Sequence, residues 1–331
     1  MSPLRVLDAA AVRAALPMRD AIAAMKRAFA AYSAGRAQVP LRTRLEVPEH
    51  EGLALFMPAV VHGDDAALAL KAVTVYNANP ARGLPLIHAA VLALDPATGQ
   101  VVGLLEGGTL TAIRTGAAAG AATDVLARPD SHVLAVFGAG VQARTQIEAV
   151  CTVRPIQQVW VYDRQPARAH ALVEELAGQG PIPADMRVAA SPAQALAEVD
   201  VVCTATTSAQ PVFDDADLRP GTHINGIGSY TPHMAEVPPE TVARAYVVVD
   251  SREAAWAEAG DLIQPLEAGR ITRAHVAAEL GEVLLGRAPA RTSRQQITFF
   301  KSVGLAVQDA LAAQVALRRA EALGLGHEVP W

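Results

Sequence analysis

The sequence predicts an α/β fold in which a doubly wound parallel sheet is combined with a second, α+β domain. The chain has 331 residues, roughly twice the ~150 residues of a typical domain, so we expect two domains. From residue 131 onward, short apolar strands alternate with helical stretches, which is typical of a doubly wound sheet. Before that point several strands follow one another and are flanked by helices, which predicts the α+β domain.

The first half begins with a helix over residues 18–34. Large apolar side chains recur there at three- and four-residue steps, and Gly35 ends the pattern. Strands are then predicted over 41–45, 53–57, 67–75, 87–94 and 101–105. The turn sequence at residues 95–99 joins the last two strands and predicts a hairpin. An alanine-rich helix follows over residues 109–126.

The second half contains the alternating strands and helices. Its predicted strands cover 132–137, 159–162, 187–189, 201–204, 223–227 and 246–249. A further strand at 297–300 leads into a final helix at 303–323, which Gly324 ends. The change of pattern and the Pro129-Asp130 pair mark a domain boundary near residues 125–131.

The composition excludes several classes of protein. A formal net charge of −5 leaves no basic surplus for phosphates, and 4% aromatic residues are too few for a surface that stacks bases. The two cysteines, Cys151 and Cys203, are far apart, which excludes a disulfide scaffold and a cysteine-based zinc site. No apolar stretch is long enough to span a membrane, and the N-terminus lacks the features of a secretory signal. We therefore expect a cytoplasmic protein that binds neither nucleic acid nor membranes.

A glycine-rich segment follows the first strand of the second half. It runs Gly138-Ala139-Gly140-Val141-Gln142-Ala143, which is G-x-G-x-x-A between a strand and a helix. Gly138 permits the tight turn, Gly140 lets the backbone approach a pyrophosphate, and Ala143 allows close packing of the helix on the sheet. The helix N-terminus would direct free N–H groups at the phosphates. The segment predicts a Rossmann-type dinucleotide site, with an accidental glycine-rich turn as the alternative.

The residues after the next strand bear on the choice of cofactor. Asp163 follows the strand at 158–162, where an acid should meet the adenosine ribose hydroxyls. A carboxylate repels a 2′-phosphate and favours NAD. The neighbouring Arg164 is either a solvated surface charge or a group that holds the phosphate of NADP. NAD(H) is therefore the favoured cofactor, and NADP(H) is possible.

Four positively charged residues in the first half are candidate substrate contacts. Lys71 lies inside an apolar strand, where it either reaches solvent from an edge or is a buried amine with a shifted pKa. Arg114 lies in the alanine-rich helix and either binds an anion or forms a structural ion pair, for example with Glu106. Arg42 and Arg44 are two residues apart on a predicted strand, so they would share a face.

Several short segments, in their order along the chain, resemble the ornithine cyclodeaminase/mu-crystallin family. The segments are Arg42-Thr43, Met57-Pro58-Ala59, Leu70-Lys71, Leu105-Glu106-Gly107-Gly108, Thr111-Ala112-Ile113-Arg114-Thr115, Gly138-Ala139-Gly140-Val141-Gln142-Ala143, Gly221-Thr222-His223-Ile224-Asn225 and Lys301-Ser302-Val303-Gly304. The resemblance covers nearly the whole chain. It implies that a Rossmann domain, residues 126–302, is inserted into a substrate-binding and dimerisation domain made of residues 1–125 and 303–331. It also implies a homodimer, with the active site in the cleft between the domains.

The resemblance further implies roles for individual residues. Lys71 corresponds to the lysine that contacts the substrate and handles its proton, and Arg114 to an arginine near the substrate carboxylate and the cofactor phosphate. Arg42, with Arg44 as a register alternative, corresponds to the carboxylate-binding arginine. The implied cofactor contacts are Arg114, Thr115, Gly138, Gly140, Val141, Gln142, Asp163, Arg164, Thr204, Thr206, Ile227, Gly228 and Ser302.

One loop departs from the pattern of the family members that deaminate amino acids. Those members carry an aspartate and a lysine where this sequence has Tyr230 and Met234. Cyclodeamination needs a group that manages several proton transfers, so the missing carboxylate argues against it.

The retained residues suit a simpler reaction. Cationic groups can hold a carboxylate, a nicotinamide can reduce an adjacent C=N carbon, and Lys71 can supply a proton to the nitrogen. The resemblance therefore implies an NAD(P)H-dependent ketimine reductase acting on 1-pyrroline-2-carboxylate or 1-piperideine-2-carboxylate. The alternatives are ornithine cyclodeaminase and a mu-crystallin-like protein that binds a nicotinamide cofactor and a small ligand. The histidines are scattered without metal-ligand spacing, so no metal is expected.

Overall fold

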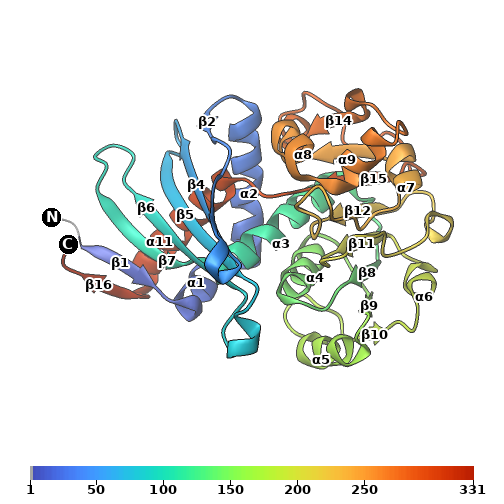
Figure 1. Cartoon of the computed structure of the whole chain (residues 1–331), viewed down its shortest axis with the longest axis horizontal. Coiled ribbons are helices and arrows are strands. Elements are labelled where there is room, and N and C mark those ends of the chain that lie inside the picture. The colour runs from blue at the N-terminus through green and yellow to red at the C-terminus, as the bar shows by residue number, and fades with distance from the viewer. Residues whose placement is uncertain (1–2) are drawn as a thin grey trace. The chain divides into compact units, whose positions relative to one another are not determined.

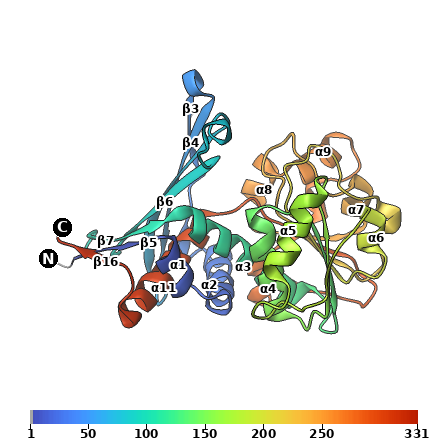
Figure 2. The ribbon, with the colours of Figure 1, turned by 90° about the horizontal axis from the view of Figure 1, so that it is seen from below.

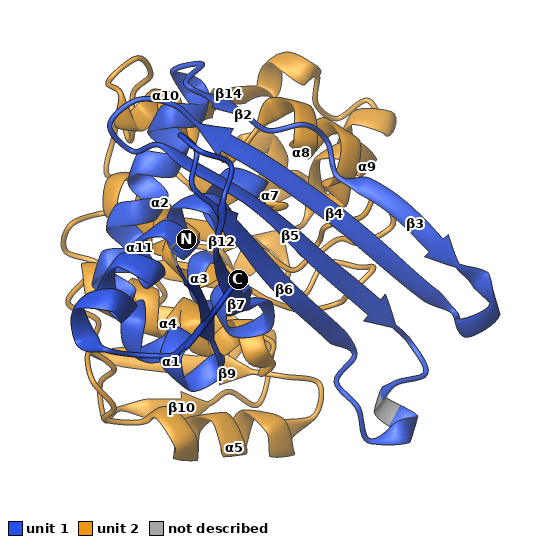
Figure 3. Cartoon of the chain, turned by 90° about the vertical axis from the view of Figure 1, so that its left-hand side faces the viewer, with its two compact units in different colours: residues 1–114, 305–331 blue, residues 115–304 orange. Residues whose placement is uncertain are grey.

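The computed structural model describes residues 3–331, which form two compact units (Figure 3). Unit 1 consists of residues 1–114 and 305–331, and unit 2 of residues 115–304. The boundary lies inside helix α3 (Gly107–Leu126), directly after Arg114. Arg114 bonds to a residue of unit 1, whereas the next turn of the helix packs on unit 2. A Cβ atom added at Gly116 would lie 2.4 Å from the carbonyl oxygen of Thr145.

Unit 1 is built on a mixed, mainly antiparallel sheet with the order β16-β1-β7-β6-β5-β4-β2, and β3 also pairs with β4. Its strands are β1 (Leu4–Leu7), β2 (Ala37–Gln38), β3 (Thr43–Val47), β4 (Gly52–Val61), β5 (Ala67–Tyr76), β6 (Ile87–Leu94), β7 (Val101–Glu106) and β16 (His327–Val329). The expected hairpin is confirmed, because β6 and β7 pair antiparallel. Strands β1 and β16 were not predicted. They pair with each other from opposite ends of the chain.

Three helices cover one face of this sheet: α1 (Ala9–Ala15), α2 (Met18–Ser33) and α11 (Ala306–Leu323). Figure 2 shows them together on one side of the strands, while the β3–β4 hairpin projects away from them. The predicted helical spacing of apolar residues in α2 is confirmed, since Ile22, Met25 and Phe29 are all buried. Side chains alternate along β5, so every second residue faces the helices.

Unit 2 contains an eight-stranded, wholly parallel sheet with the order β10-β9-β8-β11-β12-β15-β13-β14 (Figure 1). Its strands are β8 (Val133–Phe137), β9 (Gln158–Tyr162), β10 (Met186–Val188), β11 (Val201–Thr204), β12 (His223–Gly226), β13 (Tyr246–Val249), β14 (Val276–Glu279) and β15 (Thr298–Lys301). The predicted doubly wound sheet is confirmed, although β14 was not foreseen. The order reverses between β8 and β11, which is where such sheets bind ligands beyond the carboxyl ends of the strands.

Helices connect these parallel strands. They are α4 (Val141–Val153), α5 (Pro166–Leu176), α6 (Pro192–Leu196), α7 (Pro239–Arg244), α8 (Arg252–Glu258), α9 (Gly260–Glu267) and α10 (Leu280–Leu284). Every residue of β8, β11, β12 and β15 is buried, as expected for central strands covered on both faces. The carboxyl ends of these strands carry the loops that contain the predicted cofactor residues.

Candidate active site

Lys71 lies near the middle of β5, on the face of the sheet that α11 covers. It stands between Met57 of β4 and Val91 of β6, and both neighbours are buried. Only 2% of Lys71 is exposed, and its Nζ atom lies 2.8 Å from Oδ2 of Asp309 on α11. The lysine is therefore a buried amine, and the alternative of an edge residue that reaches solvent is wrong.

Arg114 points to the same carboxylate from α3. Its Nε donates to Oδ1 of Asp309 at 3.1 Å, and its Nη1 donates to Oε1 of Gln308 at 2.9 Å. The same Gln308 oxygen accepts the N–H of Leu305 at the start of α11. An ion pair of Arg114 with Glu106 is not formed, because the Glu106 carboxylate accepts the N–H groups of the first turn of α3 instead.

The electrostatic surroundings of Lys71 make it a weaker base than an ordinary lysine. Burial is the largest of the effects that together lower the pKa of Lys71 to about 8, and the Arg114 guanidinium also lowers it. Asp309 opposes both effects by its charge and by hydrogen bonding, and Arg42 adds a smaller lowering of the pKa. An amine with a pKa near 8 holds its proton at neutral pH and can also release it.

Arg42 and Arg44 do not share a strand face. Strand β3 begins at Thr43, where pairing with β4 begins, so Arg42 lies in the segment before it. Arg42 is half-buried and close enough to Lys71 to affect its pKa, whereas Arg44 is exposed on the strand. The structure thus brings Arg42 to the buried cluster, and Arg44 is not placed there.

The glycine-rich turn in unit 2 connects β8 to α4. Gly138 has a φ of +99°, and a Cβ atom at this position would lie 2.6 Å from the carbonyl oxygen of Ala205. Gly140 has an ordinary negative φ, and no atom of the described residues lies within 4 Å of where its Cβ would be. No side chain caps the start of α4, so its first N–H groups remain available. The turn therefore has the open, N–H-lined geometry that a pyrophosphate requires.

Asp163 occupies the position directly after β9. Its Oδ2 accepts the N–H of Ala139 at 2.9 Å, and its Oδ1 accepts the N–H of Gln165 at 2.8 Å. The carboxylate is thus tied to the glycine-rich turn, which the sequence did not predict. Arg164 beside it is exposed, as is Val141 at the start of α4.

A buried glutamate joins the loops that follow β11 and β12. The Glu236 carboxylate accepts hydrogen bonds from the hydroxyls of Thr204 and Thr206 and from the N–H groups of Thr206, Gly228 and Ser229. Burial raises the pKa of Glu236, and the Lys301 ammonium opposes this. The sequence did not indicate Glu236, although it predicted most of the residues that this carboxylate holds.

The remaining predicted cofactor residues also have partners inside unit 2. The N–H of Ile227 donates to the carbonyl of Thr204 at 3.0 Å, and the carbonyl of Thr115 accepts from the Gln146 amide. The Ser302 hydroxyl donates to Oδ2 of Asp250 at 2.8 Å. Asp250 was also missed, since a single acid at the end of a strand carries no motif.

Other titratable groups of the described residues do not form a second reactive site. Burial raises the pKa of Cys151 and of Cys203 to about 12, so neither is a ready nucleophile. Burial lowers the pKa of His223 to about 3, and its ring bonds to Thr298 and Asn225. Within residues 3–331, no group of three His, Cys, Asp or Glu side chains is arranged to hold a metal ion, and no helix is long and apolar enough to cross a membrane.

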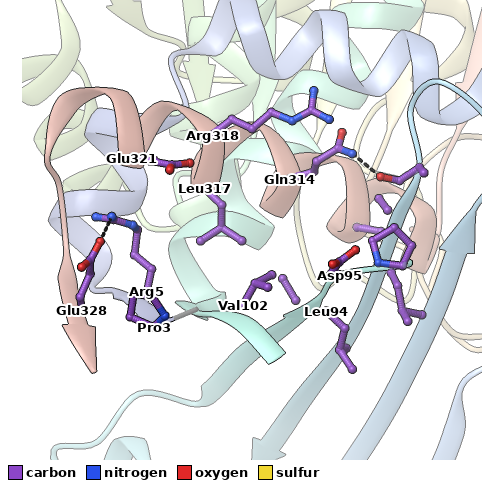
Figure 4. A pocket seen from close by; sticks show the side chains of 16 residues that line it. Pro3, Arg5, Leu94, Asp95, Val102, Gln314, Leu317, Arg318, Glu321 and Glu328 are labelled. Carbon is purple, nitrogen blue, oxygen red and sulfur yellow. Dashed lines mark hydrogen bonds and ion pairs between the residues drawn. The ribbon is translucent and has the colours of Figure 1, made fainter. Parts of the chain in front are cut away.

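A cavity of about 510 Å³ lies in unit 1 between α11 and the strands (Figure 4), and Lys71 is not among its lining residues. Its polar lining is largely engaged by the protein: Arg5 pairs with Glu328, and the Gln314 amide donates to the carbonyl of Ala66. Neither Arg114 nor Asp309 lines it. The cluster formed by Lys71, Arg114 and Asp309 is therefore the candidate substrate site, and the glycine-rich turn is the candidate cofactor site.

Comparison with known proteins identifies the family. The family model described as "Ornithine cyclodeaminase/mu-crystallin family" matches residues 4–323. The chain belongs to the ornithine cyclodeaminase/mu-crystallin family. The resemblance seen in the sequence is thereby confirmed.

Members of the family that resemble this chain include reductases. The Delta(1)-pyrroline-2-carboxylate reductase of Bacillus cereus is 39% identical over 325 residues, covering 98% of this chain and 99% of that protein. The structure of the Thermococcus litoralis Delta(1)-pyrroline-2-carboxylate reductase in complex with NADH and L-proline matches with a TM-score of 0.93 and 41% identity, over 98% of this chain and 100% of that one. An archaeal alanine dehydrogenase dimer with bound NAD matches with a TM-score of 0.91 and 33% identity, over 99% of both chains.

This family member has Tyr230 in the loop that follows β12, and 43% of the side chain is exposed. Its side chain is a phenol and supplies no carboxylate of the kind that the several proton transfers of cyclodeamination need. The loop is nevertheless held in place, because the Ser229 N–H donates to Glu236 and the Ser229 hydroxyl donates to the carbonyl of Met234.

Proposed function

We propose that this protein reduces a cyclic ketimine carboxylate, 1-pyrroline-2-carboxylate or 1-piperideine-2-carboxylate, to L-proline or L-pipecolate with NAD(P)H. The observation that carries the proposal is the buried amine of Lys71, with a pKa of about 8, beside the guanidinium of Arg114. This pairing offers one proton donor and cationic groups for a carboxylate. The similarity to pyrroline-2-carboxylate reductases along nearly the full chain supports the same reaction.

Roles follow for the residues of unit 1. Arg42 and Arg114 hold the substrate carboxylate, and the ammonium of Lys71 faces the ring nitrogen. As the C=N carbon is reduced, the π electron pair moves to the nitrogen, which takes the proton from Lys71. The apolar strand and helix around Lys71 exclude water, which strengthens these charged contacts.

NAD(H) is the favoured cofactor, and NADP(H) is possible. The open space above Gly140 and the free N–H groups of α4 fit a pyrophosphate. When bound, the reduced nicotinamide supplies hydride to the imine carbon. We assign the pyrophosphate to Gly138, Gly140, Val141 and Gln142, the ribose to Asp163 and Arg164, and the remainder to Arg114, Thr115, Thr204, Thr206, Ile227, Gly228 and Ser302.

The direct test is a pair of assays on the purified protein. We expect rapid NADH oxidation with 1-pyrroline-2-carboxylate or 1-piperideine-2-carboxylate, and little ammonia release from L-ornithine. Efficient cyclisation of ornithine would instead establish the cyclodeaminase. If neither reaction occurs while NADH still binds, the protein is a ligand-binding member of the family.

Asp163→Asn should shift the cofactor preference. The amide keeps one acceptor for the turn at Ala139 but removes the charge that repels a 2′-phosphate, and Arg164 remains to pair with that phosphate. We expect the ratio of kcat/KM for NADPH to that for NADH to rise by roughly 10-fold, which corresponds to about 1.4 kcal/mol. Asp185→Asn removes a carboxylate just before β10 and serves as the control. An unchanged ratio would contradict the ribose assignment.

We also propose that the protein is a homodimer joined through the open face of the unit 1 sheet. The face opposite the helices carries a half-exposed apolar row, in which Pro58, Leu70, Leu92 and Leu104 are neighbours in register. Unpaired apolar surfaces of this kind mark protein interfaces. A similar alanine dehydrogenase is a dimer, which supports this proposal.

Leu92→Arg should separate the subunits, because it places a charge in the centre of this row. We expect the mass measured by light scattering to fall to that of a monomer. Leu323→Arg changes an exposed leucine at the end of α11 and should leave the mass unchanged. Dimers that persist in a folded Leu92→Arg protein would place the interface elsewhere.

A further inference from the structure

Asp309 is a buried carboxylate that bridges two cations from different elements of unit 1. Only 1% of it is exposed, and it lies in the first turn of α11. Its Oδ2 is 2.8 Å from Nζ of Lys71 on β5, and its Oδ1 is 3.1 Å from Nε of Arg114 on α3. The sequence pattern did not indicate this residue, and the ketimine reduction proposed above does not by itself require it.

The geometry of the bridge is fixed on each side. Gln308, the preceding residue, accepts from both Arg114 and the Leu305 N–H, which holds the first turn of α11 and the guanidinium together. The N-terminal turn of a helix favours a negative charge, so this position suits the carboxylate of Asp309. The carboxylate of Asp309 is therefore held in a fixed position between Lys71 and Arg114.

More of the neighbouring charged groups lower the pKa of Lys71 than raise it. Arg42, from the segment before β3, and Arg114, from α3, both favour the neutral amine, as does burial. Asp309 is the one group among these that favours the ammonium. Without this carboxylate, three cationic groups would share a desolvated site, and the lysine would be the one able to lose its charge.

We propose that Asp309 is a positioning residue that keeps Lys71 protonated and directed at the substrate. The proposal rests on the proposed reductase function. During reduction an N–H bond of the Lys71 ammonium breaks and its electron pair stays on Nζ, while the proton bonds to the electron pair that the ring nitrogen gains from C=N. Asp309 stays ionised and paired with Arg114, and Lys71 regains a proton from water after product release.

The pH dependence of imine reduction by Asp309→Asn tests this role. Lys71 acts as an acid, so kcat/KM of the wild type should fall as the pH rises through about 8. Removing the charge of Asp309 lowers the pKa of Lys71, so this alkaline limb should move to lower pH by about one unit or more. The free substrate ionises identically in each assay, so a difference in the alkaline limb between variants reflects ionisation of the enzyme. The proposal is overturned if the alkaline limb of Asp309→Asn lies at the same pH as that of the wild type.

Two further variants separate charge from structure. Asp309→Glu keeps the charge and should keep the alkaline limb of the wild type even if kcat falls; a limb displaced as far as in Asp309→Asn contradicts the role of charge. Glu321→Gln removes an exposed carboxylate from the same helix and should behave as the wild type.

A measurement without substrate keeps the test independent of the reaction. Urea unfolding of the wild type, Lys71→Met, Asp309→Asn and the double variant forms a double-mutant cycle. We expect the double variant to be more stable than the sum of the single changes predicts, since Lys71→Met removes the cation that Asp309→Asn leaves unpaired. If Asp309→Asn alone does not fold, the double variant should recover folding. If the stability effects of the two substitutions are additive, Lys71 and Asp309 do not interact and the proposal is rejected. If the effects are coupled but the protein reduces no imine, only the proposed reaction is rejected.

Discussion

Lys71→Met is expected to lower the turnover of 1-pyrroline-2-carboxylate by roughly 100-fold or more, the range typical of lost general acid–base help. Methionine keeps the length and the apolar packing between Met57 and Val91 but cannot donate a proton. Asp309 would still be paired with Arg114, so the fold should survive. NADH affinity should change little, because the glycine-rich turn belongs to unit 2.

Steady-state NADH oxidation and a fluorescence titration with NADH measure the two effects separately. Lys26→Met, on α2, is the matched control and should reduce the imine at the wild-type rate. The proton-donor role of Lys71 is excluded if Lys71→Met also works at that rate.

Gly140→Val is expected to abolish NADH binding while leaving the protein folded. The glycine has a φ of −85°, which valine adopts readily, and its Cβ would enter open space. That open space is where we place the pyrophosphate, so the branched side chain would collide with the cofactor and not with the protein.

Gly138→Ala provides the contrast. Its φ of +99° and the 2.6 Å approach to the Ala205 carbonyl mean that a side chain damages the turn itself. We expect a lowered melting temperature for Gly138→Ala and an unchanged one for Gly140→Val. Unaltered NADH affinity of Gly140→Val in a fluorescence titration would remove the pyrophosphate assignment.

Much of the fold was predictable because its signals are local. The strand at residues 87–94 and the one at 201–204 were placed at their observed bounds, since apolar runs of that length between turn residues favour strands. The sequence predicts a strand over residues 41–45, whereas β3 covers Thr43–Val47, because the start of this strand depends on where β4 offers a partner and not on the sequence of the segment. Strands β1 and β16 are short and lack alternation, and each exists only because it pairs with a distant segment.

The candidate site also contains some residues that local sequence predicts and others that it does not. The glycine-rich turn and Asp163 follow from residues close together in the sequence, because a strand, a tight turn and a helix N-terminus form one local unit. Lys71 and Arg114 were recognisable as charges within apolar segments. Their common partner was not, since the bond between Arg114 and Asp309 spans 195 residues.

The α/β class and the glycine-rich turn could be predicted because they depend on residue types at short, regular spacings. The family could be predicted because several short segments occur in a particular order along the chain. Which charges meet depends instead on the tertiary packing. A strand register that turns Lys71 inward and a helix from the other end of the chain that presents Asp309 produce the buried cluster. Whether a lysine in an apolar strand is a solvated edge residue or an amine with a pKa near 8 depends on burial and on neighbouring charges, and these exist only once distant segments have packed together.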